Sequence, residues 1–136
     1  MPWIRLAVSR EAFLYAILRV VPRVERGEQI NAGVVVFCRT RRFLACRIAL
    51  DDTRRQALGA LAPGVDLDTI LHHLATIERI VRGDAAGGPI AGMDQPERFR
   101  WIVSPSSTII QPSDVHTGLT DDPAATLEHL FATLVG

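Results

Sequence analysis

Three apolar stretches in the first half of the chain are expected to form β-strands, in which successive side chains alternate between the two faces of a sheet. The first stretch covers residues 13–21 and is followed by Pro22. The second and third cover residues 30–39 and 43–50, and only Thr40-Arg41-Arg42 separates them. Because so short a turn joins neighbouring strands, we expect an antiparallel hairpin.

Two helical patterns follow these strands. Asp51-Asp52-Thr53 can cap a short helix, which the Pro63-Gly64 pair ends. Asp66 or Asp68 can cap a longer helix, whose apolar residues recur at helical spacing at Ile70, Leu74, Ile77 and Val81. We expect the glycine-rich residues 83–92 to form a loop.

The last third of the chain alternates again before a final helix. We expect two or three strands within residues 99–119, and a helix that begins at Asp122-Pro123, an acid followed by a proline suited to the first helical position. Its apolar stripe consists of Leu127, Leu130, Phe131 and Leu134. This order of elements predicts an α+β fold, in which about three helices pack against a mostly antiparallel sheet.

The length and composition are those of one globular domain. The chain has 136 residues, 48% of them hydrophobic, and its 15 basic and 15 acidic residues balance, which argues against disorder. The longest apolar run, residues 32–38, is too short to cross a bilayer. The N-terminal Met1-Pro2-Trp3-Ile4-Arg5 lacks the apolar core of a secretory signal. We therefore expect a single cytoplasmic domain over residues 1–136.

Every basic residue is an arginine. Selection for bidentate anion binding would produce this bias, but so would a GC-rich coding bias, which the high alanine content favours. The net charge of zero makes nucleic-acid binding unfavourable. Cys38 and Cys46 are expected to be free buried thiols, and no Cys, His, carboxylate or glycine spacing predicts a metal or cofactor site.

Arginines could gather on one face of the predicted sheet. Arg19 and Arg47 point away from the apolar faces of their strands, and Arg98 and Arg100 would share a face of a later strand. If these strands are neighbours, the guanidinium groups converge into a site for phosphate or carboxylate, with Ser104, Ser106 and Thr108 as further donors. The alternative, which we favour, is that Glu25, Glu28 and Glu97 pair with the arginines at the sheet rim.

His116 invites a catalytic hypothesis. It could act as a general base, oriented by Asp114 or Asp121, with a nearby serine as the nucleophile. However, a triad rarely assembles within one short segment. We favour a structural role, in which His116 and Thr117 hydrogen-bond the backbone of the loop that enters the last helix.

Two segments resemble the bacterial DUF3037 family, whose function is unknown. The first comprises residues 15–28 with 31–37; the second comprises residues 97–105, 107–108, 111–113, 115–118 and 121–123. The resemblance covers nearly the whole chain and implies no established activity. Genes of this family can lie beside genes for HipA-like kinases, so the resemblance implies a partner or regulatory role. The polar residues that it singles out as a candidate binding set are Arg19, Glu25, Arg26, Glu28, Asn31, Arg98, Arg100, Ser104, Thr108, Gln111 and His116.

Three functional hypotheses follow. The first is a non-catalytic binding or regulatory module, with a protein partner and an arginine-lined face that takes an anionic group. The second is a small enzyme for a phosphorylated or nucleotide substrate, with His116 as general acid/base. In the third, the polar set only specifies the fold. A concave pocket lined by Arg98, Arg100 and His116 would favour the enzyme, whereas a flat exposed patch would favour an interface.

Overall fold

The computed structural model describes residues 10–106 and 108–136, so the expectation for Met1 to Arg5 lies outside the described residues. Five strands occur in this part of the chain: β1 (Glu11–Val20), β2 (Ile30–Cys38), β3 (Phe43–Ile48), β4 (Ile110–Pro112) and β5 (His116–Thr120). The helices are α2 (Asp52–Leu61), α3 (Leu67–Arg82), α4 (Gln95–Val103) and α5 (Pro123–Leu134), with two short 3-10 turns, η1 (Ala85–Gly87) and η2 (Pro89–Gly92).

The strands form one antiparallel sheet around β1. The order is β3-β2-β1-β4, and β5 pairs with the same edge of β1 as β4 does, beside its first half. The predicted hairpin of β2 and β3 is confirmed, as is the α+β fold. The sheet therefore places the last two strands directly beside the first.

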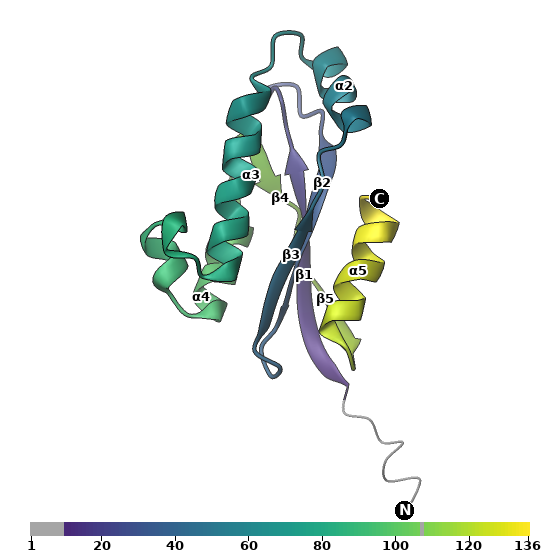
Figure 1. The fold of residues 1–136 in the computed structure, drawn as a ribbon. Helices are drawn as coiled ribbons and strands as arrows, with labels where there is room; N and C mark the ends of the chain where they lie inside the picture. The colour runs from purple at the N-terminus through teal and green to yellow at the C-terminus, as the bar shows by residue number, and fades with distance from the viewer. Residues whose placement is uncertain (1–9, 107) are drawn as a thin grey trace, which may run out of the picture.

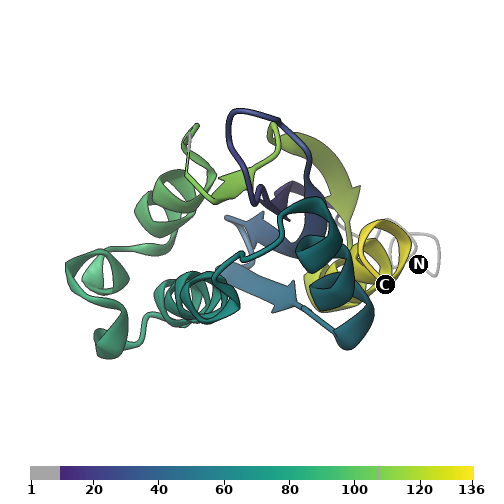
Figure 2. The ribbon, with the colours of Figure 1, turned by 90° about the horizontal axis from the view of Figure 1, so that it is seen from above.

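Helices cover both faces of the sheet, with α3 and α4 on one side and α5 on the other (Figures 1 and 2). Along β1, Ala16 and Leu18 pack in the cluster that faces α3 and α4, whereas Phe13 packs with residues of α5. Strand β2 lies between both layers, which explains why its middle is a continuous apolar run with no alternation. No helix in the described residues is long and apolar enough to cross a membrane.

The predicted helix signals hold at both long helices. Asp66 caps α3 by accepting a hydrogen bond from the Thr69 backbone amide, and α3 ends at Gly83, whose left-handed conformation suits glycine. The Thr69 hydroxyl also donates to Asp66, and these bonds lower the pKa of that carboxyl. Asp122 caps α5 in the same way, with Pro123 in the first turn.

The prediction of strand structure from residue 99 onward is wrong for residues 99–103, which belong to α4. Asp94 caps this helix and Pro96 and Glu97 occupy its first turn, the same start signal that was recognised at α5. The alternation of arginine and aromatic residues also fits a helix, because Phe99 and Ile102 lie three positions apart on the buried face. The glycine-rich segment 83–92 likewise contains the two 3-10 turns.

Candidate functional site

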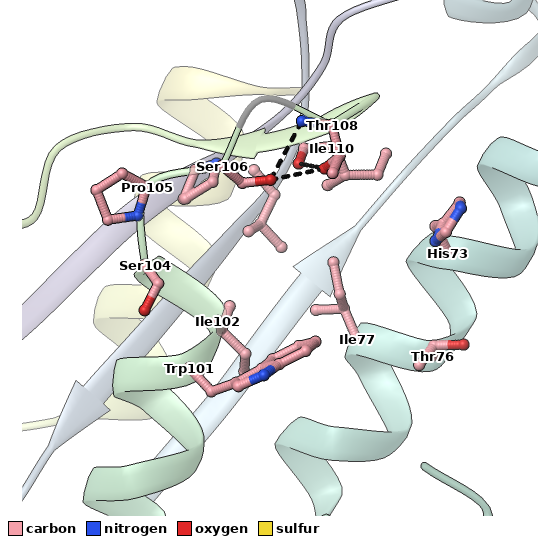
Figure 3. Close-up of a pocket in the computed structure, with 12 residues that line it drawn as sticks. His73, Thr76, Ile77, Trp101, Ile102, Ser104, Pro105, Ser106, Thr108 and Ile110 are labelled. Atoms are coloured by element: carbon pink, nitrogen blue, oxygen red, sulfur yellow. Dashed lines mark hydrogen bonds between the residues drawn. The ribbon is translucent and has the colours of Figure 1, made fainter. Parts of the chain in front are cut away.

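A groove of about 520 Å³ lies between α3, α4 and the start of β4 (Figure 3). Its apolar lining comes from four separate parts of the chain: Leu18, Ile77, Trp101, Ile102, Pro105, Ile110 and Pro112. The polar residues at its edges are His73, Thr76, Ser104, Ser106 and Thr108. The groove is therefore a mostly apolar hollow with a hydroxyl-bearing rim.

Trp101 is the dominant side chain of this groove. Helix α4 buries Arg98, Phe99 and Ile102, which leaves Trp101 on the flank of the helix that faces α3. Its side chain remains 48% exposed, although tryptophan is usually highly buried. Figure 3 shows the indole reaching across the groove toward the helix that carries Ile77. The fold thus presents a large aromatic surface to solvent at a concave position.

The hydroxyl groups on the rim are already committed to hydrogen bonds. Thr108 Oγ1 donates to the Ile110 carbonyl at 2.9 Å, so the 2.8 Å contact between Ser106 and Thr108 uses the Ser106 proton. Ser104 Oγ donates to the Arg100 carbonyl at 2.8 Å, one turn back in α4. These hydroxyls shape the loop that walls the groove, and their protons are engaged in doing so.

Arg98 has a structural position that the strand prediction could not give. Its side chain is only 8% exposed, and Nη1 donates to the Ile80 and Val81 carbonyls at 3.2 and 3.4 Å. These carbonyls lie in the last turn of α3, where a cation is favoured by the helix dipole. Gly83 leaves room for the guanidinium, since a Cβ there would overlap Nη1.

The predicted arginine face does not form. Arg100 is exposed on helix α4, and it makes no ion pair with any described residue. Arg47 points toward α5, as strand parity predicted, and lies over the Phe131 ring and near Glu128. Arg19 and Arg47 therefore share the face of the sheet toward α5, whereas Arg98 and Arg100 lie on helix α4, which covers the opposite face.

The favoured alternative, pairing of the glutamates with these arginines, is also not what the described residues show. Glu28 pairs with Arg26 in the β1–β2 connection, and neither Glu25 nor Glu97 takes part in an ion pair within the described ranges. Arg26 and Glu28 thus form a local contact far along the chain from Arg98.

Three of the predicted polar residues do meet. Arg19 of β1 lies directly opposite both Asn31 of β2 and Gln111 of β4, so the three form a row across the sheet on the face toward α5. The Asn31 amide donates to the Leu134 carbonyl at 3.1 Å, and the Gln111 amide donates to the Thr108 carbonyl at 2.9 Å. Arg19 Nε is buried without a partner among the described residues. Asn31 thus ties β2 to the end of α5, but no hydrogen bond among the described residues joins the side chains of Arg19, Asn31 and Gln111 to one another.

Among the described residues, no hydrogen bond joins His116 to a serine or to Asp114 or Asp121. His116 is exposed in β5 and stacks on Tyr15 with the ring centroids 5.1 Å apart. The nearby Ser113 hydroxyl accepts from the Ile17 amide and donates to the Asp114 carbonyl, so it serves the backbone. We expected His116 and Thr117 to pin the entry to α5, but in the described ranges that entry is held by the 2.6 Å contact between the Thr120 and Thr126 hydroxyls.

Arg98, Arg100 and His116 line neither this groove nor the cavity at the other end of α4 that is described below. Both cysteines are free thiols, as predicted, but only Cys38 is fully buried. Cys46 is half-buried, and this burial raises its pKa to about 12. The groove was not predicted from the sequence. It lies between Trp101 of α4 and Ile77 of α3, two helices that are neighbours in the fold. An aromatic residue on the exposed flank of a capped helix was the available signal.

Among known protein families, one described as "Protein of unknown function (DUF3037)" matches residues 15–135. The chain belongs to the DUF3037 family. The DUF3037 match takes in every residue that lines the groove and the whole Arg19 row. No curated protein and no solved structure matches the chain significantly.

Proposed function

We propose that this DUF3037 domain is a cytoplasmic, non-catalytic binding module that holds an apolar segment of a partner protein in the groove beside Trp101. The observation that carries the proposal is the half-exposed indole of Trp101 over an apolar hollow of about 520 Å³. Tryptophan is among the residues that contribute most to protein interfaces. The HipA-like kinase implied by the family resemblance is one candidate partner.

The energy available from Trp101 is enough for it to anchor an interaction. An aromatic side chain offers 150–250 Å² of surface, so the 48% left exposed corresponds to roughly 70–120 Å². Burying this area contributes about 2–3 kcal/mol at 25 cal/mol per Å². Ile77 and Ile102 on the two flanking helices extend the apolar surface. A partner side chain inserted here would therefore bind through contact area.

The chemistry of the groove supports binding and gives no support to a reaction. The hydroxyl protons of Ser104, Ser106 and Thr108 are engaged in hydrogen bonds within the domain. His73 is the one titratable side chain that lines the groove, and no hydrogen bond joins it to another described residue. Nucleophilic catalysis requires a base within hydrogen-bond reach of its nucleophile, and this pairing does not occur in the groove.

A photo-crosslinking experiment tests the proposal. Trp101 is replaced by p-benzoylphenylalanine, and Leu119 is replaced in a matched control, because Leu119 is 65% exposed but does not line the groove. After irradiation in the native host, the adducts are separated and the crosslinked peptides are identified by mass spectrometry. We expect position 101 to give a discrete adduct at an apolar segment of one protein, absent from position 119. No adduct at position 101, or the same adducts at both positions, would contradict the proposal.

A further inference from the structure

A second cavity, of about 420 Å³, lies between the β2–β3 turn and the first turn of α4. It is lined by Phe37, Arg39, Arg42, Asp94, Gln95 and Pro96. It thus sits at the opposite end of α4 from Trp101, and nothing in the proposed function involves it.

Specific contacts hold the walls of this cavity together. The Gln95 side-chain amide donates to the Arg42 carbonyl at 3.0 Å, which ties α4 to the turn. Within the turn, the Arg42 amide donates to the Arg39 carbonyl at 3.1 Å. Phe37 of β2 stacks on Phe99 of α4, with the ring centroids 5.1 Å apart. These contacts fix the backbone of Arg39 and Arg42, whereas the two side chains are exposed.

The two guanidinium groups at this cavity have no anionic partner among the described residues. Arg41, between them, lies 3.9 Å from Glu11, but neither Arg39 nor Arg42 forms an ion pair or a side-chain hydrogen bond there. The single carboxylate that lines the cavity is Asp94, whose Oδ1 accepts from the Glu97 amide as the cap of α4. The charges that line the cavity therefore sum to one net positive charge.

We propose that this cavity binds a small organic anion, with a phosphate or carboxylate group held by Arg39 and Arg42 and an apolar part resting on Phe37 and Pro96. Guanidinium groups suit this chemistry because each presents paired donors to two anion oxygens. In the first turn of α4, Pro96 has no N–H and the Glu97 N–H is used by Asp94, so the Gln95 N–H is the backbone donor left to assist the two arginines. The volume lies within the range of small-molecule sites.

Phenyl phosphate and benzoate are the probes, because each joins an anionic group to a flat apolar ring. The full chain, labelled with ¹⁵N, is titrated with each compound and followed by backbone amide shifts. We expect saturable shifts at residues 37–42 and 94–97, from both probes if either anionic group suffices and from phenyl phosphate alone if the site requires phosphate. Arg39→Gln and Arg42→Gln should each weaken binding at least about tenfold, because a charge-assisted bond is lost.

Two further variants make the test specific. Arg41→Gln removes an equal charge from the same turn outside the cavity lining, so binding should change less than about twofold. Asp94→Asn keeps a good helix cap and removes the repelling carboxylate, so binding should tighten about two- to fivefold. Absence of saturable shifts would overturn the proposal. Equal weakening by Arg41→Gln would also overturn it, as would selective binding of an oligonucleotide, because either would indicate a general basic surface.

Discussion

Replacing Arg98 with methionine should destabilise the domain by about 2 kcal/mol. The guanidinium donates to the Ile80 and Val81 carbonyls at 3.2 and 3.4 Å, of which only the first is near ideal length. A hydrogen bond from a charged group contributes about 1.5–3 kcal/mol, and a cation at a helix C-terminus about 0.3–1 kcal/mol. Methionine also removes a buried charge whose Nε has no partner among the described residues, and this offsets the loss of stability by about 1 kcal/mol.

Urea unfolding followed by circular dichroism measures this change. Arg100→Met is the matched control, because Arg100 lies on the same helix but is exposed, and its free energy of unfolding should change by less than about 0.5 kcal/mol. The denaturant slope should stay constant if only stability changes. A wild-type free energy of unfolding in Arg98→Met, or equal losses in both variants, would refute the role of Arg98 as the cap of α3.

A double-mutant cycle with Gly83 makes the test sharper. Gly83 has a φ of +72°, and a Cβ added there would overlap Nη1 of Arg98. Gly83→Ala should therefore cost at least about 1–2 kcal/mol from backbone conformation alone and should also displace the guanidinium. Since both changes disrupt one cap, the double variant should lose at least about 0.5 kcal/mol less than the sum of the single variants. Strict additivity would mean that Gly83 and Arg98 act independently.

Three other predictions concern the sheet. Ser113→Ala should cost about 1–3 kcal/mol in urea unfolding, because the β1 amide that it accepts from is left buried without a partner; the exposed Ser104→Ala is the control, and equal losses would contradict this. Gly118→Ala should cost about 1–3 kcal/mol, because its Cβ would come within 2.6 Å of the Phe13 ring, and an unchanged midpoint would contradict the packing. Cys46, whose pKa burial raises to about 12, should stay protonated at pH 8 and resist iodoacetamide in the folded chain, so rapid alkylation before unfolding would contradict its burial.

The strands and three of the helix starts could be predicted because they depend on local signals. Residues 13–21 carry apolar side chains toward both faces because the sheet is covered on both, and Asp51, Asp66 and Asp122 satisfy amide groups within three residues of themselves. The parity of Arg19 was also correct, since Ala16 and Leu18 face α3 and α4, whereas the Arg19 row faces α5. These features require only short stretches of sequence.

The role of Arg98 could not be predicted from such signals. Its spacing from Phe99 and Trp101 fits a strand as well as a helix, and only the start signal from Asp94 to Glu97 distinguishes the two. Even with the helix recognised, the contact of Arg98 with the end of α3 depends on how two helices separated by a turn-rich segment pack. The Trp101 groove likewise depends on the path of the loop that follows α4.

Whether Trp101 anchors a partner segment can be measured directly as the affinity of that segment for the domain. The crosslinked segment, prepared as a fluorescent peptide, is titrated by polarisation against the unmodified chain, Trp101→Ser and Leu119→Ser. We expect a loss of affinity of about 30-fold or more for Trp101→Ser, from about 2 kcal/mol of lost contact, with both variants folded and the affinity of Leu119→Ser unchanged. Equal affinity of Trp101→Ser and the unmodified chain would contradict this expectation.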